Sequence, residues 1–129
     1  MSYLLDSDII IDFLYKKDPE KTLPKLIGKD LLISVITKAE VWYGIMKSSN
    51  FKKRSEEFLD LINLMNVTVI AIDEPTIDEY VNLKVDLEKK GLKIADFDLL
   101  IASTAIVKNL ILVTRNKRHF SRISNLRFA

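Results

Sequence analysis

Three acidic residues, Asp6, Glu40 and Asp98, lie far apart in the chain but at positions that could share one site. Carboxylates that are brought together repel one another, and this repulsion raises their pKa values unless a cation lies between them. Oxygen ligands with retained waters suit Mg²⁺ or Mn²⁺. The chain has no cysteine and only one histidine, which argues against a typical zinc site. We therefore predict that the three carboxylates bind a divalent metal ion.

A divalent ion held by carboxylates can activate a water molecule and stabilise charge on a phosphoryl oxygen, so the predicted reaction is hydrolysis of a phosphodiester bond. The residues predicted to support this site are Asp96, Asn116, Asp8 and Thr114. The residues predicted to contact the phosphate backbone of the substrate are Arg115, Lys117 and Arg118.

Short apolar segments alternate with longer amphipathic segments along the chain. Strands are predicted at residues 3–5, 31–34, 67–72 and 110–114, with a possible last strand at 126–128. Helices are predicted at residues 7–16, 51–65, 74–90 and 97–108, with one more from Pro19 towards Gly28 and another that begins at Thr37. Strands separated by helices predict an α/β fold, whose mostly parallel sheet is covered by helices on both faces. The continuous apolar runs in the third and fourth strands favour central positions.

Ligands bind beyond the carboxyl ends of the strands in such a sheet. Asp6 ends the first strand, Glu40 is predicted in the first turn of the helix after the second strand, and Asp98 opens the helix before the fourth. Each residue also has a purely structural explanation. Asp6 could cap a helix, Glu40 could be the capping-box partner of Thr37, and Asp98 could complement a helix dipole. Three helix starts at one sheet edge favour the shared site.

The 129 residues, 48% of them hydrophobic, are predicted to form a single domain spanning residues 1–129. Acidic residues interrupt the N-terminal apolar stretch, which excludes a signal-peptide core, and no apolar run reaches the ~20 residues of a membrane span. A cytoplasmic location is therefore expected. The net charge of +2 is too small to indicate a nucleic-acid partner, but the segment after Asp98 contains no acidic residue and several basic ones.

Four segments in order resemble the motifs of PIN-domain proteins of the VapC toxin type. The first is LLDSDIIID at residues 4–12, and the second is TKAE followed by Tyr-Gly, at residues 37–44. The third is DLLIASTA at residues 98–105. The last is LVTRN followed by His-Phe, at residues 112–120. Each motif is weak alone, but four with suitable spacing over nearly the whole chain are specific.

This resemblance implies an α/β, PIN-like three-layer fold with a central, mostly parallel sheet of 4–5 strands flanked by helices. It implies a metal-dependent endoribonuclease toxin of a type II toxin–antitoxin system that hydrolyses structured RNA, such as tRNA, with a metal-activated water. A cognate VapB-type antitoxin and a homodimer are further expectations. Asp6, Glu40 and Asp98 occupy the positions of the three main family carboxylates. The fourth position, often an aspartate, falls on the neutral Asn116.

Other functions remain open at this point. A small haloacid-dehalogenase-like phosphatase would use Asp6 as its nucleophile, because Asp6-Ser7-Asp8 satisfies the Asp-x-Asp opening of that family. A receiver-like signalling domain and a non-catalytic PIN-like binding module are further alternatives. His119 is interpreted as a surface or half-buried histidine rather than a general base, and Trp42 as a residue of core or dimer packing.

Overall fold

The computed structural model describes residues 1–15 and 25–129. The helix predicted from Pro19 towards Gly28 therefore begins outside the described residues. The described elements, in chain order, are β1 (Ser2–Leu5), α1 (Ser7–Leu14), β2 (Asp30–Ser34), α3 (Val35–Lys47), α4 (Phe51–Leu64), β3 (Thr68–Ile70), α5 (Glu74–Lys89), α6 (Asp96–Val107), β4 (Ile111–Val113) and α7 (Lys117–Phe120).

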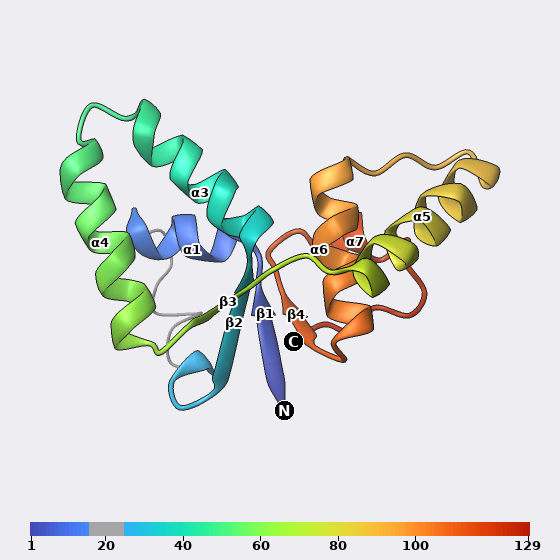
Figure 1. The fold of residues 1–129 in the computed structure, drawn as a ribbon, viewed down its shortest axis with the longest axis horizontal. Helices are drawn as coiled ribbons and strands as arrows, with labels where there is room; N and C mark the ends of the chain where they lie inside the picture. Colours follow the sequence, from blue (N-terminus) through green and yellow to red (C-terminus); the bar gives the residue numbers. More distant parts are fainter. Residues whose placement is uncertain (16–24) are drawn as a thin grey trace.

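The four strands form one sheet in the order β3-β2-β1-β4. All of its pairs are parallel, as predicted from the sequence. Tyr3 pairs with Leu31 on one side and with Ile111 on the other, so β1 is central. Helices α1, α3 and α4 cover one face of the sheet, and α5 and α6 cover the other (Figure 1). The predicted three-layer α/β fold is confirmed. Within the described residues, no helix has both the length and the apolar character needed to cross a bilayer.

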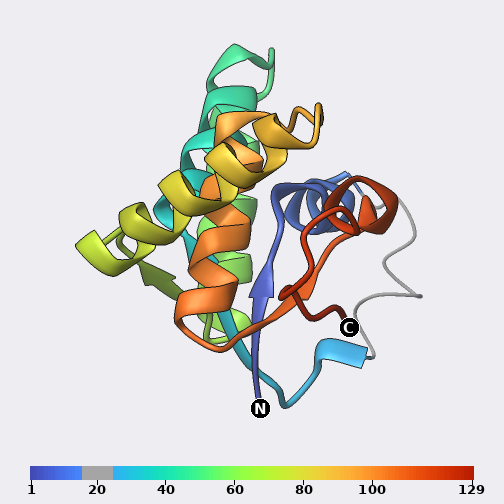
Figure 2. The ribbon, with the colours of Figure 1, turned by 90° about the vertical axis from the view of Figure 1, so that its right-hand side faces the viewer.

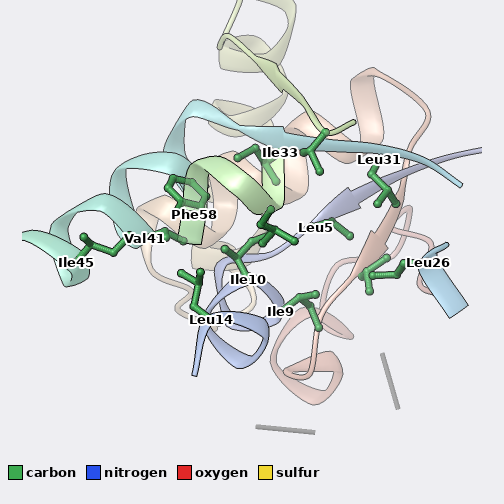
Figure 3. Close-up of a cluster of buried hydrophobic side chains, with 13 residues drawn as sticks. Leu5, Ile9, Ile10, Leu14, Leu26, Leu31, Ile33, Val41, Ile45 and Phe58 are labelled. Carbon is green, nitrogen blue, oxygen red and sulfur yellow. The ribbon is translucent and has the colours of Figure 1, made fainter. Parts of the chain in front are cut away.

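The alternation of side chains along β1 separates two hydrophobic cores. Leu5 faces α1, α3 and α4, whereas Leu4 faces α5 and α6. Figure 3 shows the first core, where Ile10 of α1, Ile45 of α3 and Phe58 of α4 converge on the inner strands. Each of these side chains is almost fully buried, so the first core fixes α1 and α3 against the sheet.

The second core contains α6, whose sequence is apolar on nearly every side. Ile101 and Ala102 are fully buried, and the Ser103 hydroxyl donates to the Leu99 carbonyl, which satisfies a polar group inside the core. The C-terminal segment closes this core with Phe120, which is also fully buried. The start of α6, which carries Asp98, is therefore held rigidly.

The predicted positions of the outer strands are wrong. β3 lies at one edge of the sheet and is short, and its Thr68 and Val69 are exposed. β4 lies at the other edge, although all three of its residues are buried. The C-terminal segment explains this burial, because the Leu112 amide donates to the Arg127 carbonyl and the Ala129 amide donates to the Leu112 carbonyl. The predicted last strand is reduced to a single parallel bridge between Leu112 and Phe128. Both ribbon views place the C-terminus beside β4 (Figures 1 and 2).

The start of α3 also differs from the prediction. Ser34 caps the helix, and its hydroxyl accepts a hydrogen bond from the Ile36 amide at 3.0 Å. Thr37 is consequently a buried residue inside the first turn, and Glu40 lies in the second turn. The capping box between Thr37 and Glu40 is therefore wrong. Trp42, which the sequence assigned to core or dimer packing, is 39% exposed, whereas the adjacent Val41 is buried.

Candidate active site

Asp6 lies at the junction between β1 and α1 and is only 5% exposed. Its backbone amide continues the sheet by donating to the Val113 carbonyl at 2.9 Å. One carboxylate oxygen, Oδ1, accepts from the Ser7 amide at 2.8 Å, so Asp6 is the N-cap of α1. The other oxygen, Oδ2, accepts from the Thr114 hydroxyl at 2.8 Å. The structural explanation for Asp6 is therefore correct, and it holds together with a position at the carboxyl edge of the sheet.

Asp8 lies two residues after Asp6 and shares Thr114 with it as a partner. Its Oδ2 atom accepts from the Arg115 amide at 3.0 Å and lies 3.2 Å from the Thr114 hydroxyl oxygen. That hydroxyl has one proton, so it donates either to Asp8 or to Asp6. In turn, the Asn116 amide donates to the Thr114 hydroxyl oxygen at 3.0 Å. The start of α1 and the end of β4 are thus linked by hydrogen bonds to side-chain oxygens.

Glu40 projects from α3 towards the same group of acids. Its charge interacts with those of Asp6, Asp98 and Asp8, and hydrogen bonding from Ser7 stabilises its charged form. The Oε1 atom of Glu40 is buried and has no hydrogen-bond partner. Glu40 therefore reaches the site from the second turn of its helix rather than from a cap.

Asp98 enters the site from the first turn of α6. Its Oδ2 atom lies 3.1 Å from His119 Nε2, and both side chains are about one-quarter exposed. The ring of His119 also meets the fully buried ring of Phe120 edge-on, at 5.6 Å between centroids. The predicted half-burial of His119 is correct, but its partner is one of the three main carboxylates.

Burial and mutual repulsion shift the titration of these acids. Desolvation is the main cause that raises the pKa of Asp6 above its usual value, and the charge of Asp98 adds to the effect. Desolvation, followed by the charge of Asp6, raises the pKa of Asp8 to about 6. The same two causes raise the pKa of Glu40. Burial and repulsion therefore disfavour simultaneous charge on Asp6, Asp8 and Glu40, as in sites that bind cations.

The donors at this site suit a hard divalent cation. Two buried carboxylate oxygens, Asp8 Oδ1 and Glu40 Oε1, have no hydrogen-bond partner among the described residues, and a buried acceptor without a partner is unfavourable. No three acidic or histidine side chains in residues 1–15 and 25–129 are grouped tightly enough to hold an ion by themselves. The carboxylates therefore fit an ion such as Mg²⁺, which binds through one or two carboxylates and keeps several waters.

In the part of the chain that the structure describes, two of the predicted supporting residues, Asp96 and Asn116, make no side-chain hydrogen bond with the four acids of the site. Asp96 Oδ1 accepts from the Tyr80 hydroxyl at 2.8 Å and forms an ion pair with Lys84 at 2.9 Å. Hydrogen bonding from Lys84 is the main cause that lowers the pKa of Asp96. Asn116 precedes α7, and its side chain makes no capping hydrogen bond. The supporting roles of Asp96 and Asn116 stay predictions.

The basic residues after β4 differ in their surroundings. Lys117 and Arg118 are exposed at the start of α7. Arg115 instead forms an ion pair with Asp12, which is only 7% exposed. The guanidinium of Arg115 therefore neutralises a buried carboxylate on α1, while its backbone amide holds Asp8.

Comparison with known proteins places this arrangement in a family. The PIN domain family matches residues 3–126. The chain belongs to this family. Within it, ribonuclease VapC2 of Rickettsia felis is 38% identical over 98% of the chain and 95% of its own length, and ribonuclease VapC1 of Methanocaldococcus jannaschii is 35% identical over 93% and 79%. The crystal structure of VapBC2 from Rickettsia felis, bound to a DNA fragment from their promoter, superposes with a TM-score of 0.87 at 36% identity, over 100% of this chain and 98% of that one.

Two residues of this VapC-family chain, Ser7 and Asp12, contribute contacts that sequence reasoning missed. Ser7 donates its amide to Asp6 and stabilises the charge of Glu40. Asp12 holds Arg115. The position of Ser7 between two acids was a usable signal for a polar site residue. Nothing in the sequence marks Asp12 as buried, since an aspartate at the end of a short helix normally faces solvent.

Proposed function

We propose that this VapC-family chain is a metal-dependent endoribonuclease that acts as the toxin of a type II toxin–antitoxin system. The observation that carries the proposal is the convergence of Asp6, Asp8, Glu40 and Asp98 at the carboxyl edge of a parallel sheet in a chain of this family. The relatives named as ribonucleases support an RNA substrate. RNA as the substrate is consistent with the predicted cytoplasmic location.

Each residue of the site has a distinct part in the proposed reaction. Asp6, Glu40 and Asp98 would hold Mg²⁺ or Mn²⁺ directly or through water. When bound, such an ion lowers the pKa of water and stabilises charge on a phosphoryl oxygen. Thr114 orients the Asp6 carboxylate by hydrogen bonding, and Asp8 adds negative charge beside it. Lys117 and Arg118, together with Arg115, would position the RNA backbone, while Asp96 and Asn116 would assist from the periphery.

The proposal includes an RNA substrate and two protein partners, an antitoxin and a second copy of this chain. The proposed substrate class is a structured RNA such as tRNA. A cognate VapB-type antitoxin is supported by the likeness to VapBC2 of Rickettsia felis. A homodimer is supported by α5, where Ile77, Val81 and Val85 repeat every four residues on one helix face and are all more than 40% exposed. Light scattering during size-exclusion chromatography would measure the dimer.

The phosphatase alternative is dropped. It would need Asp6 as a free nucleophile, but one Asp6 oxygen caps α1 and the other accepts from Thr114. Membership of the PIN domain family also replaces both the phosphatase and the receiver interpretation. A non-catalytic PIN-like module would not need to keep several mutually repelling carboxylates together, because they lower the stability of the fold.

The direct test is cleavage of a structured RNA labelled at both ends. Cleavage should require Mg²⁺ or Mn²⁺, stop when EDTA is added, and release internal ends, which distinguishes an endonuclease from an exonuclease. Asp6→Ala and Asp98→Ala should each reduce the rate by at least 100-fold, whereas the control Asp60→Asn, an exposed residue of α4, should retain it. RNA cleavage that survives both alanine substitutions would refute the assignment.

A further inference from the structure

A groove with a volume of about 530 Å³ opens beside the carboxylate site, on the face of the sheet that carries α1. Its floor includes apolar side chains from both ends of the chain, among them Tyr3, Ile111 and Phe128. The volume lies within the ~300–1,000 Å³ that is typical of ligand sites. Figure 2 shows the segment at residues 25–29 (light blue) and the C-terminal residues on the same side of β1.

Among the residues that the structure describes, the charged side chains that line this groove are all basic. They are Lys25, Lys29, Arg115 and Lys117, and no described aspartate or glutamate lines it. The three lysines are exposed. Arg115 is paired with the buried Asp12, so the lysines supply the net positive charge. The chain as a whole carries only +2, so four basic side chains around one groove are a local concentration of cations.

Two of the residues that line the groove also hold acids of the carboxylate site, although no acid itself lines the groove. Thr114 lines the groove and donates its hydroxyl proton to Asp6, and Arg115 lines the groove and donates its amide proton to Asp8. A ligand that fills the groove therefore ends next to the acids. A polyanion approaching four converging carboxylates is repelled by them, and an adjoining row of cations offsets this repulsion.

Aromatic side chains add a second kind of contact. Lys29 Nζ lies 5.8 Å from the centroid of the Tyr3 ring, so a cation and a ring meet at one point of the groove. Phe128 is partly buried and lies on the same floor. Single-stranded nucleic acids bind where cations track the backbone and aromatic rings stack on bases. An acidic polypeptide would use the cations but would not need the rings.

We propose that this groove binds the single-stranded RNA that flanks the cleaved bond, with phosphates on Lys25 and Lys29 and a base against Tyr3 or Phe128. The inference rests on the proposed ribonuclease function and extends it to a segment of the chain that precedes β2. It places two lysines, neither of them in the motif after β4, among the substrate contacts.

The test compares two double variants with the same change in charge. Lys25→Gln/Lys29→Gln alters the groove, whereas Lys52→Gln/Lys53→Gln alters two exposed lysines in the first turn of α4, outside the groove. All four residues are exposed, so both variants should fold, which circular dichroism would confirm. A labelled single-stranded oligoribonucleotide serves as the probe in both a binding assay in EDTA, read by fluorescence anisotropy, and a cleavage assay in Mg²⁺.

The groove variant should raise KM and Kd about tenfold at 0.1 M salt and leave kcat within twofold, since each lost phosphate contact removes ~0.7 from the slope of log K against log salt. The control variant should match the wild type. If both variants cleave RNA with the same KM, the proposal that RNA binds in the groove is refuted, and the proposed ribonuclease function is unaffected. Binding that depends on Lys25 and Lys29 in a protein that never cleaves RNA would support the groove and refute the ribonuclease. Unchanged RNA binding, with poly-glutamate binding lost in the groove variant, would assign the groove to an acidic protein instead.

Discussion

Replacing Asp8 with asparagine should stabilise the protein at neutral pH. Burial and the neighbouring charge of Asp6 raise the pKa of Asp8 from 3.8 to about 6, so its charged form is unfavourable in the folded state. The shift of about 2.2 pH units corresponds to an upper limit of about 3 kcal/mol, at 1.36 kcal/mol per unit. Asparagine removes the charge but keeps a side-chain oxygen that can accept from the Arg115 amide and the Thr114 hydroxyl.

The melting temperature is the simplest measure of this effect. For 129 residues, an unfolding entropy of about 2.1 cal/mol/K per residue converts 3 kcal/mol into a rise of about 11 °C. Local rearrangement and entry of water around the charged carboxylate reduce the effect, so an increase of about 5 °C is expected in EDTA at pH 7.5. Asp60→Asn, at an exposed position on α4, is the matched control and should change little.

The pH dependence tests the cause. The folded state holds the proton of Asp8 more tightly than the unfolded state, so the stability of the wild type falls as the pH rises from about 4 to about 6. The gap between Asp8→Asn and wild type should therefore be full at pH 7.5 and should shrink towards pH 4. Adding Mg²⁺ at pH 7.5 should raise the melting temperature of the wild type more than that of the variant. A variant that melts no higher than the wild type at pH 7.5, or whose gap is unchanged at pH 4, would refute this reasoning.

Three further predictions concern other parts of the structure. His119→Ala should lower kcat for RNA cleavage about tenfold with little change in KM, because the histidine holds the Asp98 carboxylate. His119→Gln should recover most of this loss, and an equal loss in both variants would contradict the role. Asp73→Asn should lower the urea midpoint at pH 7, because hydrogen bonds from Lys108 and from the capped helix lower the pKa of Asp73 to about 2. This stabilisation is lost as the pH falls through that value, so the effect of the substitution should be much smaller near pH 2. An unchanged midpoint at pH 7 would contradict this role. Leu112→Ala should cost about 3 kcal/mol in chemical denaturation, since Leu112 is fully buried, and a cost below about 1 kcal/mol would contradict the packing described.

The layered fold could be predicted because local patterns determine it. Asp6 ends a short apolar strand, and the alternation of strands and helices implies a parallel sheet with its site at one edge. The order of strands could not be predicted in the same way. β4 has a continuous apolar sequence that is typical of a central strand, but the C-terminal segment, rather than another strand, covers its outer edge.

In the candidate site, too, some positions could be predicted from local sequence patterns and others could not. Asp6 and Asp98 lie beside the ends of elements, so their positions followed from the predicted boundaries. The helix α3 begins earlier than predicted, because Ser34 rather than Thr37 is its N-cap. Glu40 nevertheless interacts with the other acids. The contact between His119 and Asp98 joins residues 21 positions apart, on α7 and α6, with β4 between them in the chain. No local pattern marks this contact, so only the folded chain shows it.

The hydrogen bond from Thr114 to Asp6 spans 108 positions of the chain, and this separation has a consequence for the timing of activity. Asp6 follows β1, the first strand that a ribosome produces, whereas Thr114 follows β4. Contacts of such long range form late in folding. A growing chain therefore has its first carboxylate long before it has the strand that completes the catalytic edge. The complete carboxylate edge therefore exists only in a chain whose C-terminal segment has docked beside β1.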